Sequence, residues 1–364
     1  MMFLIAGLLV LHFVVLWWLN NGVDIVVKST RNTDPEYESA DFTIVVPFRN
    51  EMSNIPILIE CLRKQKLENN SVNVIFINDH STDNSVLQLE ELITNNFPFR
   101  TKLLNLEKGE GLGKKKALFK AIQTATTQFI IQIDCDVVLK EKWLESVIRN
   151  VYKDTDLLVL PVSIDGRKQW FQEFEFSALQ FVTFGMAGNN APILCNGANL
   201  VYRKSAWVGT FETVQKGDSG DDIFLLQEFL ATNQKLNFAY SKNLIVQTSS
   251  AAGYTNFIQQ RLRWAGKNRN VSIPKYKLTT IYLGLLQFIP FIICIINFKI
   301  GLLFLILKIA IDFYFVRIYR LRNEQNTSLI HFILSAFIMP LYLITLLFGQ
   351  MLIKPKWKGR KVNV

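Results

Sequence analysis

The chain has 364 residues, of which 50% are hydrophobic and 19% are charged, and its formal net charge is +10. The charged fraction is below that of an average soluble domain, and 28 phenylalanines exceed what one soluble core of this size needs. This composition excludes an ordinary soluble enzyme, a disordered chain and a collagen-like repeat. Four cysteines without paired spacing exclude a disulfide scaffold or a zinc finger, and three histidines argue against a His-rich metal site.

The first apolar segment, residues 1–23, carries no charged side chain and is long enough to cross a hydrocarbon core of about 30 Å. It lacks the basic start and the small-residue cleavage site of a signal peptide, so we expect an uncleaved anchor. Lys28 and Arg31 follow it, and nothing basic precedes it. The positive-inside rule therefore predicts that the next domain is cytoplasmic.

Three further apolar segments, residues 278–297, 301–315 and 329–353, predict a C-terminal transmembrane region over residues 278–353. The second contains Lys308 and Asp312, which we expect to pair with each other four residues apart rather than to line a substrate path. A basic tail, residues 354–364, follows. One N-terminal and three C-terminal spans would place this tail outside, against the positive-inside rule. Either one segment is re-entrant or interfacial, or the rule fails here.

Between the apolar segments, residues 41–275 predict an α/β domain. Short β-branched runs predict strands, and segments with helical periodicity alternate with them. The expected strands are residues 42–47, 72–78, 102–106 and 129–133, and the expected helices are residues 55–66, 84–95 and 114–124. This alternation predicts a doubly wound, mostly parallel sheet, which binds ligands beyond the carboxyl ends of its strands. No glycine-rich dinucleotide fingerprint or P-loop is present.

Polar residues stand directly after three of these predicted strands. The third such cluster is Asp134-Cys135-Asp136, whose two carboxylates can reach one hard divalent cation such as Mg²⁺ or Mn²⁺. Such a cation would stabilise a diphosphate leaving group. A pair of carboxylates at this spacing is also common in solvated turns, so this cluster alone does not identify a metal site.

Six motifs in order resemble those of membrane-bound glycosyltransferases of family 2, which have the GT-A fold. They are Pro47-Phe48-Arg49-Asn50-Glu51, Asn78-Asp79-His80-Ser81-Thr82-Asp83, Gly113-Lys114-Lys115-Lys116-Ala117-Leu118, Asp134-Cys135-Asp136, Gly220-Asp221-Asp222 and Gln260-Arg261-Leu262-Arg263-Trp264. The resemblance covers residues 41–270, and the flanking apolar segments fit it. Asn78 departs from the family, which often has Asp there, but the functional Asp of the family corresponds to Asp79.

The resemblance implies roles for individual residues. It implies that the nucleotide sugar is bound by Pro47, Asn50, Glu51, Asp79, Lys114, Asp134, Gln260, Arg263 and Trp264. It implies that Asp136 and Asp134 hold the metal. Asp83 has two alternatives, a site role or a cap for the helix that follows, and Glu51 could equally cap its own helix.

The same resemblance implies that Asp222 is the catalytic base, with Asp221 beside it. Both also precede a predicted helix, whose dipole favours negative charge at that end, and the two interpretations are compatible. The segment from Cys195 to Arg203 resembles the acceptor side of the family, and the acceptor residues that follow from it are Asn196, Gly197, Asn199 and Trp264. Gln260 to Trp264 lie on a basic amphipathic segment, residues 257–270, next to the first C-terminal span, where an interfacial helix is expected.

We therefore expect a multi-pass membrane enzyme of a bacterial inner membrane. Its divisions are an anchor (residues 1–23), a cytoplasmic GT-A domain (residues 41–275), a C-terminal membrane region (residues 278–353) and the basic tail. The resemblance implies an inverting, metal-dependent transfer from a UDP- or GDP-linked sugar to a lipid or glycan acceptor, without nucleic acid. We favour single transfer to a lipid, because few spans leave little room for a polysaccharide channel. The alternatives are a processive synthase of a β-linked polysaccharide, a non-catalytic scaffold of the same fold, and a cation-binding or transport protein.

Overall fold

The computed structural model describes residues 2–30, 41–66, 71–94, 96–107, 113–165, 169–207, 221–267, 271–354, 356–357 and 360–361. The chain forms two compact units. The helical unit comprises Met1–Lys28, Ile164–Leu194 and Ser272–Ile353, and the sheet unit comprises Ser29–Ser163, Cys195–Val271 and Lys354–Val364. The chain therefore enters the sheet unit three times. The division into anchor, cytoplasmic domain, membrane region and tail stays a prediction.

The sheet unit is built on a seven-stranded sheet in the order β3-β2-β1-β4-β8-β6-β9. Parallel pairing joins β1 (Phe42–Phe48), β2 (Val72–Asn78), β3 (Arg100–Asn105) and β4 (Phe129–Ile133). Every residue of β1 and β4 is buried, as expected for β-branched runs covered on both faces. The four predicted strands are thus present, and they pair in the parallel arrangement that their alternation with helices predicted.

The second half of the sheet reverses direction. β8 (Asn199–Arg203) pairs antiparallel with both β4 and β6 (Leu157–Val159), and β9 (Leu236–Phe238) pairs parallel with β6. A smaller sheet has the order β5-β10-β7, with β5 (Val137–Val138), β10 (Val246–Ser249) and β7 (Val162–Asp165). A two-stranded hairpin, β11 (Lys356–Trp357) and β12 (Arg360–Lys361), completes the described strands.

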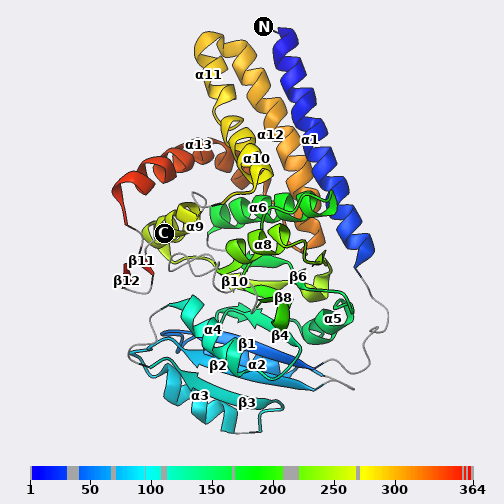
Figure 1. Cartoon of the computed structure of the whole chain (residues 1–364). Coiled ribbons are helices and arrows are strands. Elements are labelled where there is room, and N and C mark those ends of the chain that lie inside the picture. Colours follow the sequence, from blue (N-terminus) through cyan, green and yellow to red (C-terminus); the bar gives the residue numbers. More distant parts are fainter. Residues whose placement is uncertain are drawn as a thin grey trace. The chain divides into compact units, whose positions relative to one another are not determined.

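The helices of the sheet unit occupy the predicted positions, residues 55–66, 84–95 and 114–124, and several further segments. They are α2 (Ile55–Arg63), α3 (Ser85–Thr94), α4 (Lys114–Thr124), α5 (Trp143–Arg149), α8 (Asp221–Ala231), α9 (Gly253–Lys267) and the short 3₁₀ helix η1 (Lys242–Leu244). α2 and α4 bury an apolar stripe, for example Ala117, Leu118, Ala121 and Ile122 on α4. The contacts of α4 are with β1 and β2, which fixes its N-terminus near the ends of these strands (Figure 1).

The helical unit contains α1 (Met2–Ser29), α6 (Trp170–Gly188), α10 (Pro274–Leu285), α11 (Ile289–Ile296), α12 (Phe298–Arg322) and α13 (Leu329–Leu352). Among the residues that the structure describes, three segments are long and apolar enough to cross a membrane: Met2–Ser29, Pro274–Ile296 and Leu329–Leu352. The expected span at residues 278–297 is divided between α10 and α11, with Pro290 in the first turn of α11. Pro340 lies inside α13, and within this unit α13 runs across the direction of α1 and α12 (Figure 1).

The charged residues inside α12 have partners. Lys308 Nζ lies 2.6 Å from Asp312 Oδ2, and His12 Nε2 of α1 lies 2.6 Å from Asp312 Oδ1. Gln287 accepts a further hydrogen bond from Lys308, at 3.2 Å. The expected pairing of Lys308 with Asp312 is confirmed. Because the cluster also includes α1, it ties two apolar helices together, which is how ionisable groups are accommodated away from water.

A second charged contact joins α1 and α12 closer to their ends. Arg322 Nη2 lies 2.6 Å from Asp24 Oδ1. His12 of α1 pairs with Asp312 of α12, and Asp24, further along α1, pairs with Arg322, further along α12. The two helices therefore run parallel and side by side (Figure 1). At 1.5 Å per residue, these two contacts hold the helices together over about 15 Å of their length.

Candidate active site

The residues expected to bind a nucleotide lie where β1 and β2 end. Phe48 and Asn78 are the last residues of these strands and are partners in the parallel register, so the loops that follow leave the sheet together. The amide of Asp79 donates to the carbonyl of Phe48 at 2.9 Å. Pro47 lies within β1 opposite Ile77, where it contributes backbone shape rather than a polar group.

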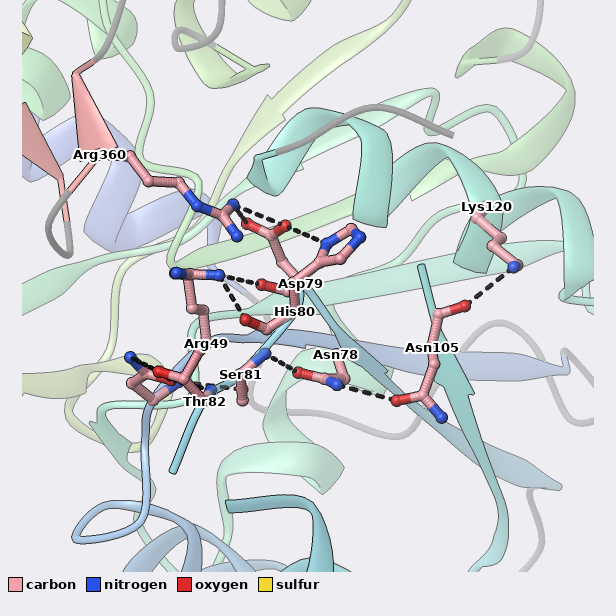
Figure 2. Close-up of polar contacts among 10 residues, drawn as sticks. Arg49, Asn78, Asp79, His80, Ser81, Thr82, Asn105, Lys120 and Arg360 are labelled. Atoms are coloured by element: carbon pink, nitrogen blue, oxygen red, sulfur yellow. Dashed lines mark hydrogen bonds and ion pairs between the residues drawn. The ribbon is translucent and has the colours of Figure 1, made fainter. Parts of the chain in front are cut away.

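Hydrogen bonds lock these two loops together (Figure 2). Arg49 Nη1 donates to the carbonyl oxygen of Asp79 at 2.8 Å and also to that of His80. Asn50 Oδ1 accepts from the amide of Thr82 at 2.8 Å, while the amide of Asn50 donates to Ser81 Oγ at 3.0 Å. Asn50 and His80 both have positive φ values, 50° and 54°. Such a backbone persists in non-glycine residues only where surrounding contacts fix it.

Asn78, the departure from the family pattern, has a bracing role. Its Nδ2 donates to Asn105 Oδ1 at 2.9 Å, and its Oδ1 accepts from the amide of Ser81 at 2.8 Å (Figure 2). Lys120 of α4 donates to the carbonyl of Asn105 at 2.9 Å. The Asn78 side chain is therefore committed to protein contacts, and the carboxylate at this point of the site is that of Asp79.

The Asp79 carboxylate is 1% exposed and is surrounded by donors. Arg360 Nη1 lies 3.0 Å and 3.1 Å from its two oxygens, and His80 Nδ1 lies 3.2 Å from Oδ1. Burial, and then the positive charge of Arg360, lower the pKa of Arg49, while Asp79 opposes this effect. Two guanidinium groups thus share the neighbourhood of one carboxylate.

Glu51 and Asp83 hold the starts of the following helices. Glu51 Oε2 accepts from Asn54 Nδ2 at 2.6 Å, just before α2. Asp83 Oδ1 accepts from both the amide and the hydroxyl of Ser85, the first residue of α3. Of the two alternatives for Asp83, these contacts favour the helix cap, and Glu51 has a comparable local contact.

A second group of predicted residues meets around the backbone of Gly197. Lys114 Nζ lies 2.6 Å from Asp134 Oδ1 and 3.5 Å from the carbonyl oxygen of Gly197. The amide of Gly197 donates to Asp222 Oδ2 at 3.3 Å, and Gln132 Nε2 donates to its carbonyl at 2.8 Å. Residues from four separate segments therefore form one continuous network, Asp134–Lys114–Gly197–Asp222. We call it the Gly197 network.

Asp222 lies at the beginning of α8, where the helix dipole favours its negative charge. Its Oδ1 accepts from the amide of Ile223 at 2.8 Å, and the Cys195 thiol donates to its carbonyl oxygen at 3.2 Å. The carboxylate is partly exposed, so it is oriented by the protein and still open to solvent. Asp221 is the first residue of the same helix, but its side chain lies outside the described residues.

Asp136 and Asp134 follow the carboxyl end of β4, as expected. Asp136 Oδ2 accepts from the hydroxyl of Thr248 at 3.1 Å, so β10 of the smaller sheet braces this carboxylate. Cys135 between them is 2% exposed, in agreement with a small apolar role. Among the described residues, no group of three or more His, Cys, Asp or Glu side chains gathers into a metal site.

The expected acceptor residues differ in their surroundings. Asn196 is partly exposed beside Gly197. Asn199 is 0% exposed, and its Nδ2 donates to the carbonyls of Pro161 and Leu244 at 2.8 Å and 2.9 Å. Its Oδ1 accepts from Trp143 Nε1 at 3.3 Å. Because its amide is occupied by protein partners, the position of Asn199 favours a supporting role below the acceptor segment rather than contact with an acceptor.

The remaining motif lies on α9. Gln260, Arg263 and Trp264 are partly exposed there. Arg261, between them, is 2% exposed and stacks over the rings of Phe257 and Trp264, 4.7 Å and 4.2 Å from their centroids. Arg261 Nη1 also donates to Gln260 Oε1 at 2.6 Å. Sequence reasoning treated Arg261 as a spacer, yet it positions two predicted site residues through cation–π contacts and a hydrogen bond.

Arg360, Gln132 and Thr248 also touch the predicted site residues and were missed. Gln132 lies one residue before the end of β4, and Thr248 is within β10, so both belong to elements that end at the site. The strand-end rule could have found these two. No signal in the sequence connects Arg360 to Asp79, 281 positions away.

Two family models match the chain. Glycosyl transferase family 2 matches residues 43–209, and Glycosyl transferase family group 2 matches residues 129–352, more than half of the chain. The chain belongs to glycosyl transferase family group 2. No curated protein matches it. Nucleotide-sugar transfer, which the motifs implied, is the activity of this family, so the six motifs led to the correct family.

A solved mannosyltransferase shares the fold, and two further solved structures are less similar to the chain. A mannosyltransferase from Pyrobaculum calidifontis, solved with GDP-Man and Mn²⁺, is 13% identical and has a TM-score of 0.54, with 93% of this chain and 95% of that chain covered. TarS from S. aureus is 18% identical, with a TM-score of 0.42 over 67% of this chain and 43% of that chain. Glucosyl-3-phosphoglycerate synthase from Mycobacterium tuberculosis is 15% identical, with a TM-score of 0.37 over 58% and 70% of the two chains. The first likeness confirms the predicted GT-A fold of this glycosyltransferase.

Proposed function

We propose that this glycosyltransferase transfers a sugar, with inversion, from a nucleotide-diphosphate sugar to a membrane lipid at the cytoplasmic face. The observation that carries the proposal is the Gly197 network. It joins a carboxylate suited to deprotonate an acceptor, Asp222, to a cation suited to a diphosphate, Lys114. The two groups are connected through a single glycine of the segment that resembles the acceptor side of the family.

The chemistry follows from these positions. In an inverting transfer one carboxylate takes the proton of the acceptor hydroxyl while the hydroxyl oxygen attacks the anomeric carbon, and the nucleoside diphosphate leaves. Asp222 has the properties of that base, because the amides of Gly197 and Ile223 orient it and solvent reaches it. Lys114 stabilises the negative charge that builds up on the departing diphosphate. Asp79 accepts hydrogen bonds from the nucleoside.

A divalent cation fits the donor set beside this network. Asp134 and Asp136 supply carboxylate oxygens, and Mg²⁺ or Mn²⁺ at such sites commonly completes its shell with water and substrate phosphates. The Thr248 hydroxyl orients Asp136. When bound, the cation would supply charge neutralisation at the diphosphate. Lys114, which pairs with Asp134, would supply a further positive charge for the diphosphate.

The helical unit supports a specific topology, and its few candidate spans favour a lipid acceptor over a polysaccharide channel. α1 and α12 run parallel and are joined by charged contacts at mid-length and near their ends. If α1 crosses toward the cytoplasm, α12 crosses in the same direction after α10 and α11 have crossed outward. The tail, Lys354–Val364, belongs to the sheet unit, so α13 then lies in the interface without crossing. In this arrangement the basic tail faces the cytoplasm, as the positive-inside rule expects.

The activity is tested with membranes that contain the protein, incubated with Mn²⁺ or Mg²⁺ and each of a panel of labelled UDP- and GDP-sugars. Label is expected in the organic-soluble fraction, and the anomeric configuration of the product, read by NMR, is expected to be opposite to that of the donor. Label in a high-molecular-weight fraction would instead establish a processive synthase. Membranes without the protein provide the blank, and chelation of the metal is expected to abolish transfer.

The base assignment is tested with Asp222→Asn. We expect transfer to fall by about a hundred- to ten-thousand-fold, with nucleotide affinity retained, because the amide cannot accept the acceptor proton. Asp154→Asn is the matched control, since Asp154 is an exposed carboxylate that pairs with exposed Lys235 at 3.7 Å. Undiminished transfer by Asp222→Asn would show that another group is the base.

A further inference from the structure

The C-terminal hairpin of β11 and β12 is part of the sheet unit, although the helices of the helical unit precede it in the chain. β11 lies beside α9, the helix that carries Gln260, Arg263 and Trp264. From β12, the side chain of Arg360 extends to Asp79 (Figure 2). The hairpin therefore reaches two of the segments that we assign to donor binding.

The contact between Arg360 and Asp79 joins a guanidinium group to a buried carboxylate. One guanidinium nitrogen, Nη1, donates to both carboxylate oxygens, at 3.0 Å and 3.1 Å. The Asp79 side chain is 1% exposed and that of Arg360 is 23% exposed. A charge-assisted hydrogen bond to a buried carboxylate is stronger than a neutral one, so this contact holds the hairpin on the site.

Arg360 occupies the same acceptor atoms that a nucleoside would use. A base or ribose binds a carboxylate by donating N–H or O–H groups to its oxygens, which is what Arg360 Nη1 does here. The Asp79 carboxylate has about four acceptor sites. Arg360 Nη1 lies against both of its oxygens, His80 Nδ1 lies 3.2 Å from Oδ1, and the residue is only 1% exposed, so a nucleoside has no access to the carboxylate while Arg360 covers it. Binding of a nucleoside at Asp79 therefore requires Arg360 to move.

The charge around Asp79 indicates where Arg360 would go. The guanidinium group of Arg360 lies on the Asp79 carboxylate, and that of Arg49 lies on the backbone carbonyl of the same residue, so two positive charges meet at Asp79. Once a nucleoside satisfies Asp79, Arg360 loses the carboxylate with which it pairs among the described residues. A diphosphate supplies one, and its oxygens match a guanidinium well.

We propose that Arg360 is a donor-binding residue that exchanges partners: it pairs with Asp79 in the free enzyme and with the diphosphate in the donor complex. The inference rests on the proposed function and deepens it, because it assigns the C-terminal hairpin to the donor site. It gives the enzyme a means to favour nucleoside diphosphates over nucleosides. A nucleoside only displaces Arg360, whereas a nucleoside diphosphate also rebinds it.

The test compares binding of UDP and uridine, and of GDP and guanosine, to the full-length protein in detergent with Mn²⁺, by calorimetry. The wild type shows which of the two diphosphates, UDP or GDP, is bound. Arg360→Gln is expected to bind that diphosphate about tenfold more weakly, since a charge-assisted contact is lost. The same variant is expected to bind the nucleoside several-fold more tightly, because Arg360 no longer competes with the nucleoside for Asp79. The preference for diphosphate over nucleoside therefore falls by more than tenfold.

Two variants serve as comparisons. Lys354→Gln removes one positive charge from an exposed position of the same tail, and it is expected to leave both affinities close to the wild-type values. Arg360→Lys keeps the charge but loses the planar guanidinium, and it is expected to lie between the wild type and Arg360→Gln. The thermal midpoint of each variant is measured alongside, to show that the protein remains folded.

Three results would overturn the exchange. If Arg360→Gln tightens both ligands, Arg360 is only a competitor. If it weakens both equally, the hairpin only supports the site. If it changes neither, the contact with Asp79 has no part in donor binding. In each of these cases the wild type still binds the diphosphate and transfers sugar, so the proposed function stands. A wild type that neither binds nor transfers any donor of the panel would end both proposals.

Discussion

Asp83 ends the polar loop after β2, and its carboxylate accepts two hydrogen bonds from Ser85 at the start of α3. Burial raises the pKa of Asp83, but the hydrogen bonds from Ser85 outweigh this effect and the net pKa is below the usual 3.8. The folded protein therefore binds this proton less readily than the unfolded chain. The ionised carboxylate contributes stability above pH 3.8, and this contribution is lost as the pH falls through the folded pKa.

The corresponding variant is Asp83→Asn, which keeps a capping oxygen but removes the charge. At pH 7 we expect it to be less stable than the wild type by about 0.5 kcal/mol, the size of a charge effect at a helix start. Below pH 3.8 the difference should close. Thermal midpoints of both proteins in detergent, measured from pH 7 to pH 3, test this. A difference that stays constant over this range would contradict it.

At the scale of residues, the sequence indicated which side chains lie together in the site, but it did not indicate all of their contact partners. Asp79, Lys114, Asp134 and Asp222 follow strands or begin helices, and the rule for parallel sheets brings such positions to one edge. Their partners were harder to find. Arg261 looks like one more cation on an amphipathic helix, and only the fold shows that two aromatic rings enclose it. Arg360 belongs to a short basic tail, a composition that is typical of a membrane flank.

At the scale of elements, the crossing of α1 and α6 depends on glycine. A Cβ atom at Gly22 would overlap the carbonyl oxygen of Gly185, and one at Gly188 would overlap the backbone of Gly22. Asn189 adds hydrogen bonds to the carbonyls of Trp18 and Gly185, both at 2.8 Å. Small residues at such a crossing allow two helix backbones to approach closely.

Gly22→Ala is therefore expected to destabilise the protein by about 1–3 kcal/mol, as an overpacked contact does. Gly7→Ala is the matched control, because a Cβ at Gly7 would meet nothing within 4 Å. Both changes replace glycine by alanine in the same helix and gain the same helix propensity, so their difference isolates the crossing. The measurement is the thermal midpoint in detergent. Equal midpoints for the two variants would mean that the crossing adapts.

Helices and strands were largely predictable where a single local sequence pattern determines them. Buried β-branched runs predicted β2 and β4 to the residue, and helical periodicity did the same for α4. The direction of β8 was not predictable, because pairing on the far side of β4 depends on contacts distant in sequence. The helix α6 is rich in aromatic residues. It packs against α12 and α13 in the helical unit, where Phe174 joins Val316 and Phe332 in one core cluster.

At the scale of the whole molecule, the proposed topology predicts which positions share a face of the membrane. Cysteines introduced at Lys142, Ser328 and Lys354, all exposed, should react with a membrane-impermeant maleimide from the same face. A cysteine at Met2 should react from the opposite face. The background should carry Cys61→Ser and Cys294→Ser, the two natural cysteines that are not buried. If Ser328 labels with Met2 instead, α12 does not cross and α13 does.

The order of the chain through the two units has a practical consequence. Residues 164–194 leave the sheet unit between β7 and β8, and the tail returns to it after α13. A protein shortened after α9 to make it soluble would still carry α6, whose aromatic side chains would lose α12 and α13 and face water. It would also lack Arg360. Preparations of this enzyme for binding or kinetic work should therefore keep every helix and the tail, in detergent or in a reconstituted bilayer.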